Sequence, residues 1–588
     1  MNVIGLKIMD YTIQPKDRIS KLPDFIIHHI MSHLPAKKVT QTSILSKRWS
    51  SLWTSFPIFD FDQTYFQGLH EVWDKERFYT FLNFVDASLL RFCKLRFSVQ
   101  KFRLSIGHPG IDGSFSLIDN WIGLVVENEV KTLDLNLIKH KASMLNSMFL
   151  DLLDSPPQMI ELDLYVLYTL PQTIFSAKSL TTLKLCGCKL DHPSGTISFP
   201  FLKELSLDKV FVNEQMVQEL IRECPLLENL VFRFCCGVKR FCVSNALKLK
   251  VMEIFTYYDE VECFKIAAPS LEECTLWFEK RMRSCMIDMT KCPSLNYLNL
   301  VGANLTDQQF HNIVSKFPLL ENLHLCLCNF LTNVTFSSNR LKKLEFHNCY
   351  GLKVIDIDTP NLVSFYYHSD QIPISSINAP CPWEVGFDSG RPLDTRWYLN
   401  LKDFLRTSKQ IKNLFVYVKS RGNSFELDKF QRSSPSPPCE VGHLDLFMER
   451  VPPNYAAFLS GLLSVCRPRI LSLEVWNNTD NFFQWLYDEL RKRDAQCCSS
   501  HSIKCWRHDL KDCKIDGFTP YGDADDVDDT GGTRVKRKRK PSEKGLELQA
   551  VKVRKPLKSS GRSSKVKGRS TIDQEISNGV YGDDVSDE

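Results

Sequence analysis

The feature that most constrains the fold of this chain is a Leu-x-x-Leu-x-Leu pattern that recurs at short, nearly regular intervals. Its regular copies begin at Leu180, Leu202, Leu227, Leu249, Leu271, Leu295, Leu320, Leu341 and Leu362. Successive starts therefore lie 22, 25, 22, 22, 24, 25, 21 and 21 residues apart. Each copy predicts one short strand whose alternate apolar side chains point into a shared core, while the residue between them faces outward.

Intervals of about 20 to 29 residues with this spacing are the signature of leucine-rich repeats. Less regular copies extend the series in both directions, beginning at Val130, Met159, Ile411 and Ile470. The aromatic run Phe365-Tyr366-Tyr367 ends the regular part and Cys274 replaces a strand leucine, so we expect the array to distort or to be capped near residue 370. The fold class predicted is α/β, a leucine-rich-repeat solenoid (horseshoe).

Two segments between strands predict helices on the outer side of the repeats. They are NEQMVQELIRECP at 213–225 and TDQQFHNIVSKFP at 306–318, and both have apolar residues at helical spacing.

The residues before the repeats predict a small helical module at 17–60. Asp24 suits the start of a first helix that ends before Pro35. A second predicted helix contains Val39, and Ser46 can cap a third. Helices shorter than about 12 to 15 residues are marginal in water, so these need mutual packing, a following domain or a partner. Leu22, Pro23 and two tryptophans give the module more large apolar surface than it can readily bury, which favours a partner.

The stretch LPDFIIHHIMSHLPAKKVTQTSILSKRWSSLW resembles the plant F-box motif, with its LPD opening, its LP break and its SKRWxxLW close. That resemblance implies docking on a Skp-family adaptor, and through it on a cullin scaffold with the ubiquitin-conjugating machinery. The residues that it implies will form or support the adaptor face are Leu22, Pro23, Ile27, Ile30, Leu34, Pro35, Val39, Leu45, Ser46, Arg48 and Trp49. An ordinary three-helix cap on a repeat domain stays open as the alternative.

The irregular repeat lengths, and cysteines after several strands, resemble the plant F-box/leucine-rich-repeat family. The segment CWRHDLKDCKIDGF from Cys505 resembles one that often closes such proteins, near the FBD region, and KDCKIDGF within it predicts a strand. The family implies a substrate-recognition adaptor of an SCF-type E3 ubiquitin ligase, whose repeats bind an unknown target protein. A ubiquitin-independent nuclear scaffold is the alternative.

Catalysis and metal binding are not predicted. The sequence has no RING spacing, no phosphate-binding GxxxxGK[ST] loop and no paired acid/base constellation. The 21 cysteines are scattered through a long chain, so we expect reduced thiols, mostly buried, with no zinc site and no cofactor. His501, Cys505 and His508 could be imagined as ligands or as a nucleophile with its base, but a hydrogen-bonded role in a folded cap is favoured.

Charge and hydropathy predict a soluble intracellular protein. The net charge of +5 is too balanced for a nucleic-acid or membrane binder, and no apolar run is long enough for a signal peptide or a membrane-spanning helix. The tail is different, because an acidic run precedes a basic run made by Arg534, Lys536, Arg537, Lys538, Arg539 and Lys540. We expect this tail to be disordered and to direct nuclear import, with the cytoplasm as a second compartment. A nucleic-acid patch and a plain solvated tail remain alternatives, and the lack of interleaved aromatics disfavours base stacking.

These observations together predict the following division of the chain. It comprises a flexible N-terminus (1–16), the F-box-like module (17–60), a linker with the N-terminal cap of the repeats (61–124), the leucine-rich repeats (125–394), a terminal FBD-like cap with further repeats (395–518) and a disordered charged tail (519–588).

Overall fold

A computed structural model describes most of the chain between residues 19 and 515. The described residues are 19, 22–66, 74–107, 113–138, 168–256, 261–278, 286–369, 372–379, 383–389, 393–408, 411–418, 423–434, 436–477, 480–491 and 510–515. They form two compact units, the first reaching to residue 238 with 244–249, and the second made of 239–243 and the residues from 250 onward.

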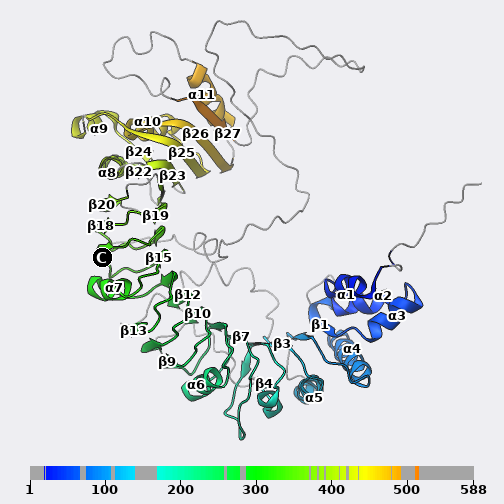
Figure 1. The fold of residues 1–588 in the computed structure, drawn as a ribbon. Helices are drawn as coiled ribbons and strands as arrows, with labels where there is room; N and C mark the ends of the chain where they lie inside the picture. Colours follow the sequence, from blue (N-terminus) through cyan, green and yellow to red (C-terminus); the bar gives the residue numbers. More distant parts are fainter. Residues whose placement is uncertain are drawn as a thin grey trace, which may run out of the picture. The chain divides into compact units, whose positions relative to one another are not determined.

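In the first unit, a parallel sheet follows an N-terminal helical module (Figure 1). Its strands pair in the order β1 (Ile58–Asp62), β2 (Lys101–Ser105), β3 (Thr132–Asn136), β5 (Thr182–Cys186), β7 (Glu204–Asp208) and β8 (Asn229–Arg233). The connections contain η2 (Gln63–Phe66), α4 (Lys75–Cys93), α5 (Ser114–Glu127), β4 (Tyr168–Thr169), η6 (Gln172–Ser176), β6 (Cys188–Lys189) and α6 (Glu214–Arg222).

The second unit contains a longer parallel sheet of the same kind. Its strands are β10 (Val251–Thr256), β12 (Glu273–Phe278), β14 (Tyr297–Val301), β15 (Asn322–Cys326), β17 (Lys343–His347), β19 (Ser364–His368), β21 (Trp383–Ser389), β23 (Ile411–Val418), β25 (Cys439–Arg450), β26 (Cys466–Asn477) and β27 (Asp512–Ile515). They pair in that order, and every pair is parallel.

Short strands and helices occupy the connections of this second sheet. The strands β9 (Arg240–Val243), β11 (Cys263–Ile266) and β13 (Met286–Asp288) form one small sheet, and β16 (Asn333–Ser337), β18 (Val354–Asp358) and β20 (Ile374–Asn378) form another. The other connecting elements are α7 (Asp307–Val314), β22 (Leu393–Asp394), α8 (Thr395–Thr407), β24 (Asn423–Ser424), α9 (Leu427–Ser433), α10 (Tyr455–Val465) and α11 (Asp480–Arg491).

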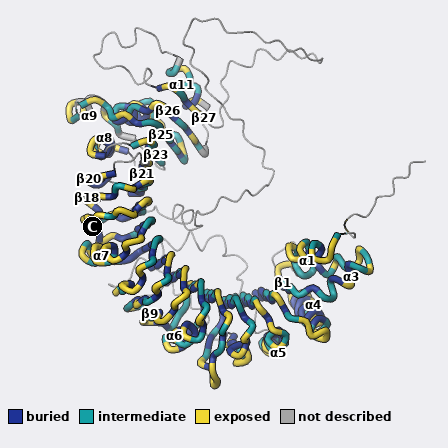
Figure 2. Tube along the Cα trace, in the orientation of Figure 1, coloured by how far each residue is buried: buried dark blue, intermediate teal, exposed yellow. Residues whose placement is uncertain are grey.

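The predicted repeats are confirmed in their register. The nine strands predicted from Leu180 to Leu362 are β5, β7, β8, β10, β12, β14, β15, β17 and β19, and each begins two residues after its first leucine. That leucine is buried in the turn before the strand, as Leu180 and Leu202 show. Buried and less buried residues then alternate along the strands (Figure 2). The predicted α/β fold of helical module and leucine-rich repeats is therefore confirmed.

Among the nine regular repeats, the longest connections hold the helices. Twenty residues (209–228) separate β7 from β8, and twenty (302–321) separate β14 from β15; these connections contain the predicted helices α6 and α7. Sixteen residues (327–342) separate β15 from β17, and there the connection forms the short strand β16 instead. Length alone does not decide this, because the 15 residues 451–465 between β25 and β26 hold the helix α10.

The expected cap near residue 370 was wrong, although the register shifts at Trp383/Glu384, where β21 pairs with β23. β19 pairs with β21 from Ser364 and Glu384 onward, and β21 pairs with β23, so the sheet continues past this point. Phe365 and Tyr367 are buried, so aromatic side chains take the places of leucines in the core. Cys274 is buried in the same way. The strands predicted at Ile411 and Ile470 are β23 and β26, and the one predicted in KDCKIDGF is β27.

Residues 61–124 are more than a linker. β2 lies between β1 and β3 in the sheet, and α4 and α5 occupy the connections, so strand–helix units begin before residue 125. Other predictions fall outside the described residues: the copy at Met159, the residues His501, Cys505 and His508, and the charged tail with its basic run at 534–540.

Candidate adaptor-binding surface

The N-terminal module consists of the three predicted helices, α1 (Asp24–Ser32), α2 (Ala36–Thr42) and α3 (Lys47–Thr54). Pro23 and Pro35 precede α1 and α2 with φ angles of −56° and −60°, which the proline ring fixes in a range compatible with helix entry. Ser46 caps α3 as predicted, because its hydroxyl accepts a hydrogen bond from the Trp49 backbone N–H at 3.2 Å.

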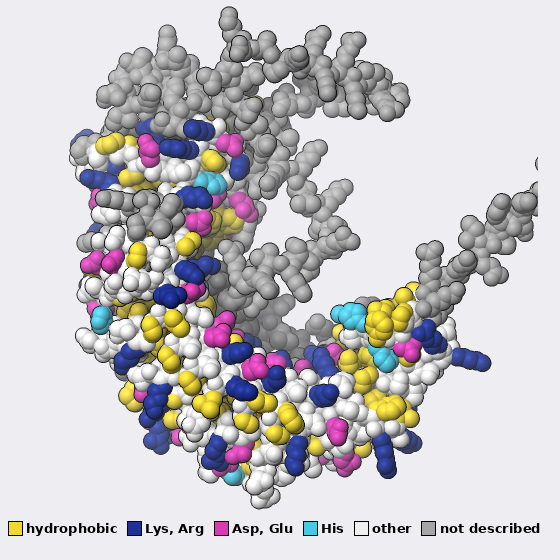
Figure 3. Space-filling view, in the orientation of Figure 1, with side chains coloured by type: hydrophobic (Ala, Val, Ile, Leu, Met, Phe, Trp, Pro, Cys, Tyr) yellow, Lys and Arg dark blue, Asp and Glu magenta, His cyan; other side chains and the backbone are white. Residues whose placement is uncertain are grey.

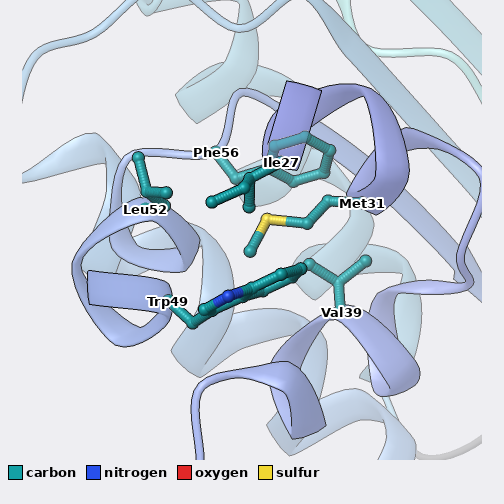
Figure 4. Packing of buried hydrophobic residues seen from close by; sticks show 6 residues of the cluster. All are labelled: Ile27, Met31, Val39, Trp49, Leu52 and Phe56. Carbon is teal, nitrogen blue, oxygen red and sulfur yellow. The ribbon is translucent and has the colours of Figure 1, made fainter. Parts of the chain in front are cut away.

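Six side chains from this module form its closed core: Ile27, Met31, Val39, Trp49, Leu52 and Phe56 (Figure 4). Three residues assigned to the adaptor face from the sequence, Ile27, Val39 and Trp49, therefore lie inside the module and can only support that face. Helical spacing shows which residues share one side of a helix. It does not show whether that side is buried within the module or exposed to a partner.

Arg48, also assigned to the adaptor face, is engaged within the module. Its Nη2 donates to the Leu22 carbonyl at 2.6 Å, and its Nε donates to Asp24 Oδ1 at 3.1 Å. These bonds hold the start of α1 against α3. Because the Arg48–Asp24 pair is partly exposed, its stabilising effect is at most about 1 kcal/mol.

The module also has a distinctly exposed apolar surface, which we call the Phe25/Ile44 surface and define by Pro23, Phe25, Ile44 and Leu45. Ile44 is 85% exposed and Phe25 is 70% exposed, the two highest values for large hydrophobic side chains among the described residues, and Leu45 is 60% exposed. Hydrophobic side chains gather around α1 and α2 in the space-filling view (Figure 3). Of the remaining predicted residues, Leu22, Ile30, Leu34, Pro35 and Ser46 are half-buried.

Phe25 and Ile44 were missed from the sequence, although one signal could have revealed Phe25. It lies two residues before the buried Ile27, and at about 100° per residue this places it on the opposite side of α1. A large apolar residue on the polar side of a short helix indicates a surface that another chain covers.

Other surfaces of the module contact the rest of the first unit. The Arg91 guanidinium of α4 lies 3.4 Å from the ring centroid of Trp53, and burial lowers the pKa of Arg91 to about 10. Lys37 donates to the Tyr65 carbonyl at 3.1 Å and lies over the ring of Phe66. These contacts fix the module on its own repeats while the Phe25/Ile44 surface remains exposed.

The described residues give no sign of catalytic or metal chemistry. No cluster of three or more His, Cys, Asp or Glu suited to a metal occurs among them, and their cysteines form no disulfides. Burial raises the pKa of the Cys188, Cys224 and Cys466 thiols to about 12, which makes them poor nucleophiles. In the same part of the chain, no helix combines the length and apolar character needed to cross a membrane.

Comparisons with known proteins decide the family. Residues 19–61 match the F-box domain, residues 119–299 match the LRR repeats of FBD-associated F-box protein At5g56370, and residues 281–380 match the LRR domain of At1g61320/AtMIF1. The chain is 32% identical to the F-box/FBD/LRR-repeat protein At1g78750 of Arabidopsis thaliana, over 62% of this chain and 75% of that protein. It belongs to the plant F-box/leucine-rich-repeat family.

Further relatives of this F-box/leucine-rich-repeat protein support the same family assignment. A putative FBD-associated F-box protein of Arabidopsis thaliana, At5g53635, is 30% identical over 74% of this chain and 88% of its own length. F-box/LRR-repeat protein 13 of the same plant is 29% identical over 62% of this chain and 75% of its own length. The F-box match covers α1 to β1, which include the closed core and the Phe25/Ile44 surface.

Proposed function

We propose that this F-box/leucine-rich-repeat protein is the substrate-recognition subunit of an SCF-type E3 ubiquitin ligase. F-box/leucine-rich-repeat proteins generally act as such adaptors. The F-box would bind a Skp-family adaptor, and through it a cullin, while the repeats bind a target protein for ubiquitination. The subunit itself performs no chemistry, since ubiquitin transfer occurs elsewhere in the complex.

The observation that supports this proposal most is the Phe25/Ile44 surface beside a core that is already closed. Because Ile27, Met31 and Trp49 are buried without any help from Phe25 or Ile44, the exposed pair adds little to folding. Covering one large apolar side chain stabilises a complex by about 1.5 to 3 kcal/mol. The exposed side chains of this one small module therefore offer enough apolar surface to anchor a partner.

Replacing Phe25→Ser together with Ile44→Ser should abolish binding of a Skp-family adaptor. If each side chain contributes about 2 kcal/mol, as interface anchors do, the double variant should bind about 1,000-fold more weakly. The measurement is capture of a purified Skp-family adaptor by the tagged full chain, with cullin detected in the captured complex.

The matched control is the double variant Leu247→Ser with Phe330→Ser, because these side chains are 66% and 60% exposed but lie outside the F-box. It should capture the adaptor as the unmodified chain does, and both variants should keep the thermal midpoint. Full capture by the Phe25/Ile44 variant would contradict the proposed surface. Failure of the unmodified chain to capture any Skp-family adaptor or cullin would favour the ubiquitin-independent scaffold.

We further propose that the protein acts in the nucleus, directed there by the basic run at 534–540. The support is its composition, because Arg534, Lys536 and the four residues that follow place six positive charges in seven positions. Replacing all six by Gln in a fluorescent fusion of the full chain should shift it from the nucleus to the cytoplasm. An unchanged nuclear fraction would contradict this assignment.

A further inference from the structure

The parallel register of the second unit places outward-facing side chains in rows across its sheet. One row contains His324, Glu345, Tyr366, Gly386, Phe415, Asp445 and Ser472, and a neighbouring row contains Cys326, His347, His368, Asp388, Tyr417, Phe447 and Glu474. A third row contains Asn322, Lys343, Ser364, Glu384, Asn413, His443 and Ile470. Neighbours in a row are one strand spacing apart, about 4.8 Å.

These three rows, which we call the acidic–aromatic face, have an excess of negative charge. Their described positions from β15 to β26 include the carboxylates Glu345, Glu384, Asp388, Asp445 and Glu474, against a single lysine, Lys343, and four histidines, His324, His347, His368 and His443. In β27 the rows continue to Asp512 and Lys514, whose charges cancel. The chain as a whole is positively charged, at +5. The formal charge of this face is therefore opposite in sign to that of the whole chain.

Three of the carboxylates lie beside histidines, and the first of these is Asp445, whose Oδ1 lies 3.1 Å from His443 Nε2. Glu345 Oε2 lies 3.0 Å from His324 Nδ1 and 3.2 Å from His347 Nε2, and although burial opposes it, these bonds keep the pKa of Glu345 well below its ordinary value. Asp388, only 3% exposed, has Oδ2 3.3 Å from His368 Nδ1. Glu345 and Asp388 are therefore fixed in position on the face by neighbouring histidines.

Aromatic rings lie among these carboxylates. The Tyr366 hydroxyl donates to Asp388 Oδ2 at 3.4 Å, and the Tyr417 and Phe447 rings lie 4.9 Å apart. Tyr366 leans over Gly386, since a Cβ at that position would lie 2.4 Å from its Cδ2 atom. Glycine is therefore required at 386 for this ring to lie against β21.

More accessible groups surround this buried centre. Phe415 is exposed in the row that begins with His324. Glu384 and Glu474 are exposed in the two other rows, which flank that row on either side. Carboxylates next to aromatic rings are the surroundings in which a Lys or Arg side chain is bound best, because the ring faces and the acids both attract a cation.

We propose that the acidic–aromatic face binds a lysine- or arginine-bearing segment of the target protein, in an extended conformation that crosses the strands. This inference rests on the proposed function, in which the repeats recruit the target, and it adds the chemical class of the segment that is recognised. Charge complementarity is the argument for this occupant, and the rings supply apolar contact along the stems of its side chains.

The test uses the purified full chain and a fluorescent peptide of alternating lysine and serine, with glutamate in place of lysine in the matched control peptide. The lysine peptide should bind at least about tenfold more tightly than the glutamate peptide, and its affinity should fall as salt is added. The variant Glu384→Gln with Asp445→Asn should bind it about five- to tenfold more weakly.

The control variant Asp191→Asn with Glu228→Gln changes the net charge equally at half-buried, ion-paired positions of the first unit, and it should leave peptide affinity unchanged. Equal loss in both variants, or no preference for the lysine peptide, would overturn the inference. Binding that appears only after the basic run at 534–540 is replaced by Gln would also overturn it, because the chain's own tail would then occupy the face. Adaptor capture measured on the same proteins distinguishes a failure of this inference from a failure of the proposed function.

Discussion

Replacing Trp49 by Ala should unfold the F-box module and abolish adaptor capture. Trp49 is 2% exposed and packs in the six-residue core with Ile27, Met31 and Val39 (Figure 4). Truncation of a buried tryptophan costs about 3 to 5 kcal/mol, which three short helices cannot lose and stay folded. Limited proteolysis of the full chain should show new cleavage between Asp24 and Ser55, while the repeats remain resistant.

Trp49→Phe is the matched control for this experiment. The indole Nε1 is buried without a hydrogen-bond partner among the described residues, so a phenyl ring keeps most of the apolar volume and sacrifices no hydrogen bond. We expect a cost of about 1.5 kcal/mol or less and retained adaptor capture. If Trp49→Ala instead stayed protease-resistant and bound the adaptor normally, the core of Figure 4 would not be what holds the module together.

Gly302→Ala should destabilise the second unit strongly. Gly302 follows β14 with φ at +69°, and a Cβ there would lie 2.2 Å from the Phe278 carbonyl oxygen at the end of β12. The left-handed conformation and the forced backbone shift together should cost about 2 to 4 kcal/mol. Urea unfolding monitored by circular dichroism measures this change in the free energy of unfolding.

Gly123→Ala should have the opposite effect on stability. Gly123 lies within α5 and has no positive φ, and a Cβ added there would meet no atom of another element within 4 Å. Alanine should therefore stabilise the helix by about 0.5 to 1 kcal/mol. An equal response to both substitutions would mean that the close approach at Gly302 does not restrict the fold.

Much of the repeat architecture follows from the sequence, because a buried leucine at a fixed place in each repeat defines the strand that follows. The pattern fails where other residues fill the same place. The buried hydrophobic side chains of β21 are Val385 and Phe387, and the strand has no leucine, so it was not predicted. Phe365 and Tyr367 suggested an end of the array, but there the core continues with aromatic residues in place of leucines.

The adaptor surface was less predictable than the repeats. Sequence resemblance identified the right module and its three helices, and Pro23 and Leu45 are indeed exposed. It could not separate residues that form the core from residues that a partner contacts, because both sets are apolar. Only packing shows that Trp49 is buried while Phe25 and Ile44 are not.

The most direct test of the account is amide hydrogen exchange on the full chain with and without a purified Skp-family adaptor. We predict slower exchange in peptides covering Phe25 and Ile44 when the adaptor is present, and unchanged exchange in β14 to β19. Protection confined to the repeats, or no protection between Leu22 and Ser46, would contradict the claim that this exposed apolar surface of the F-box is made to be covered by an adaptor.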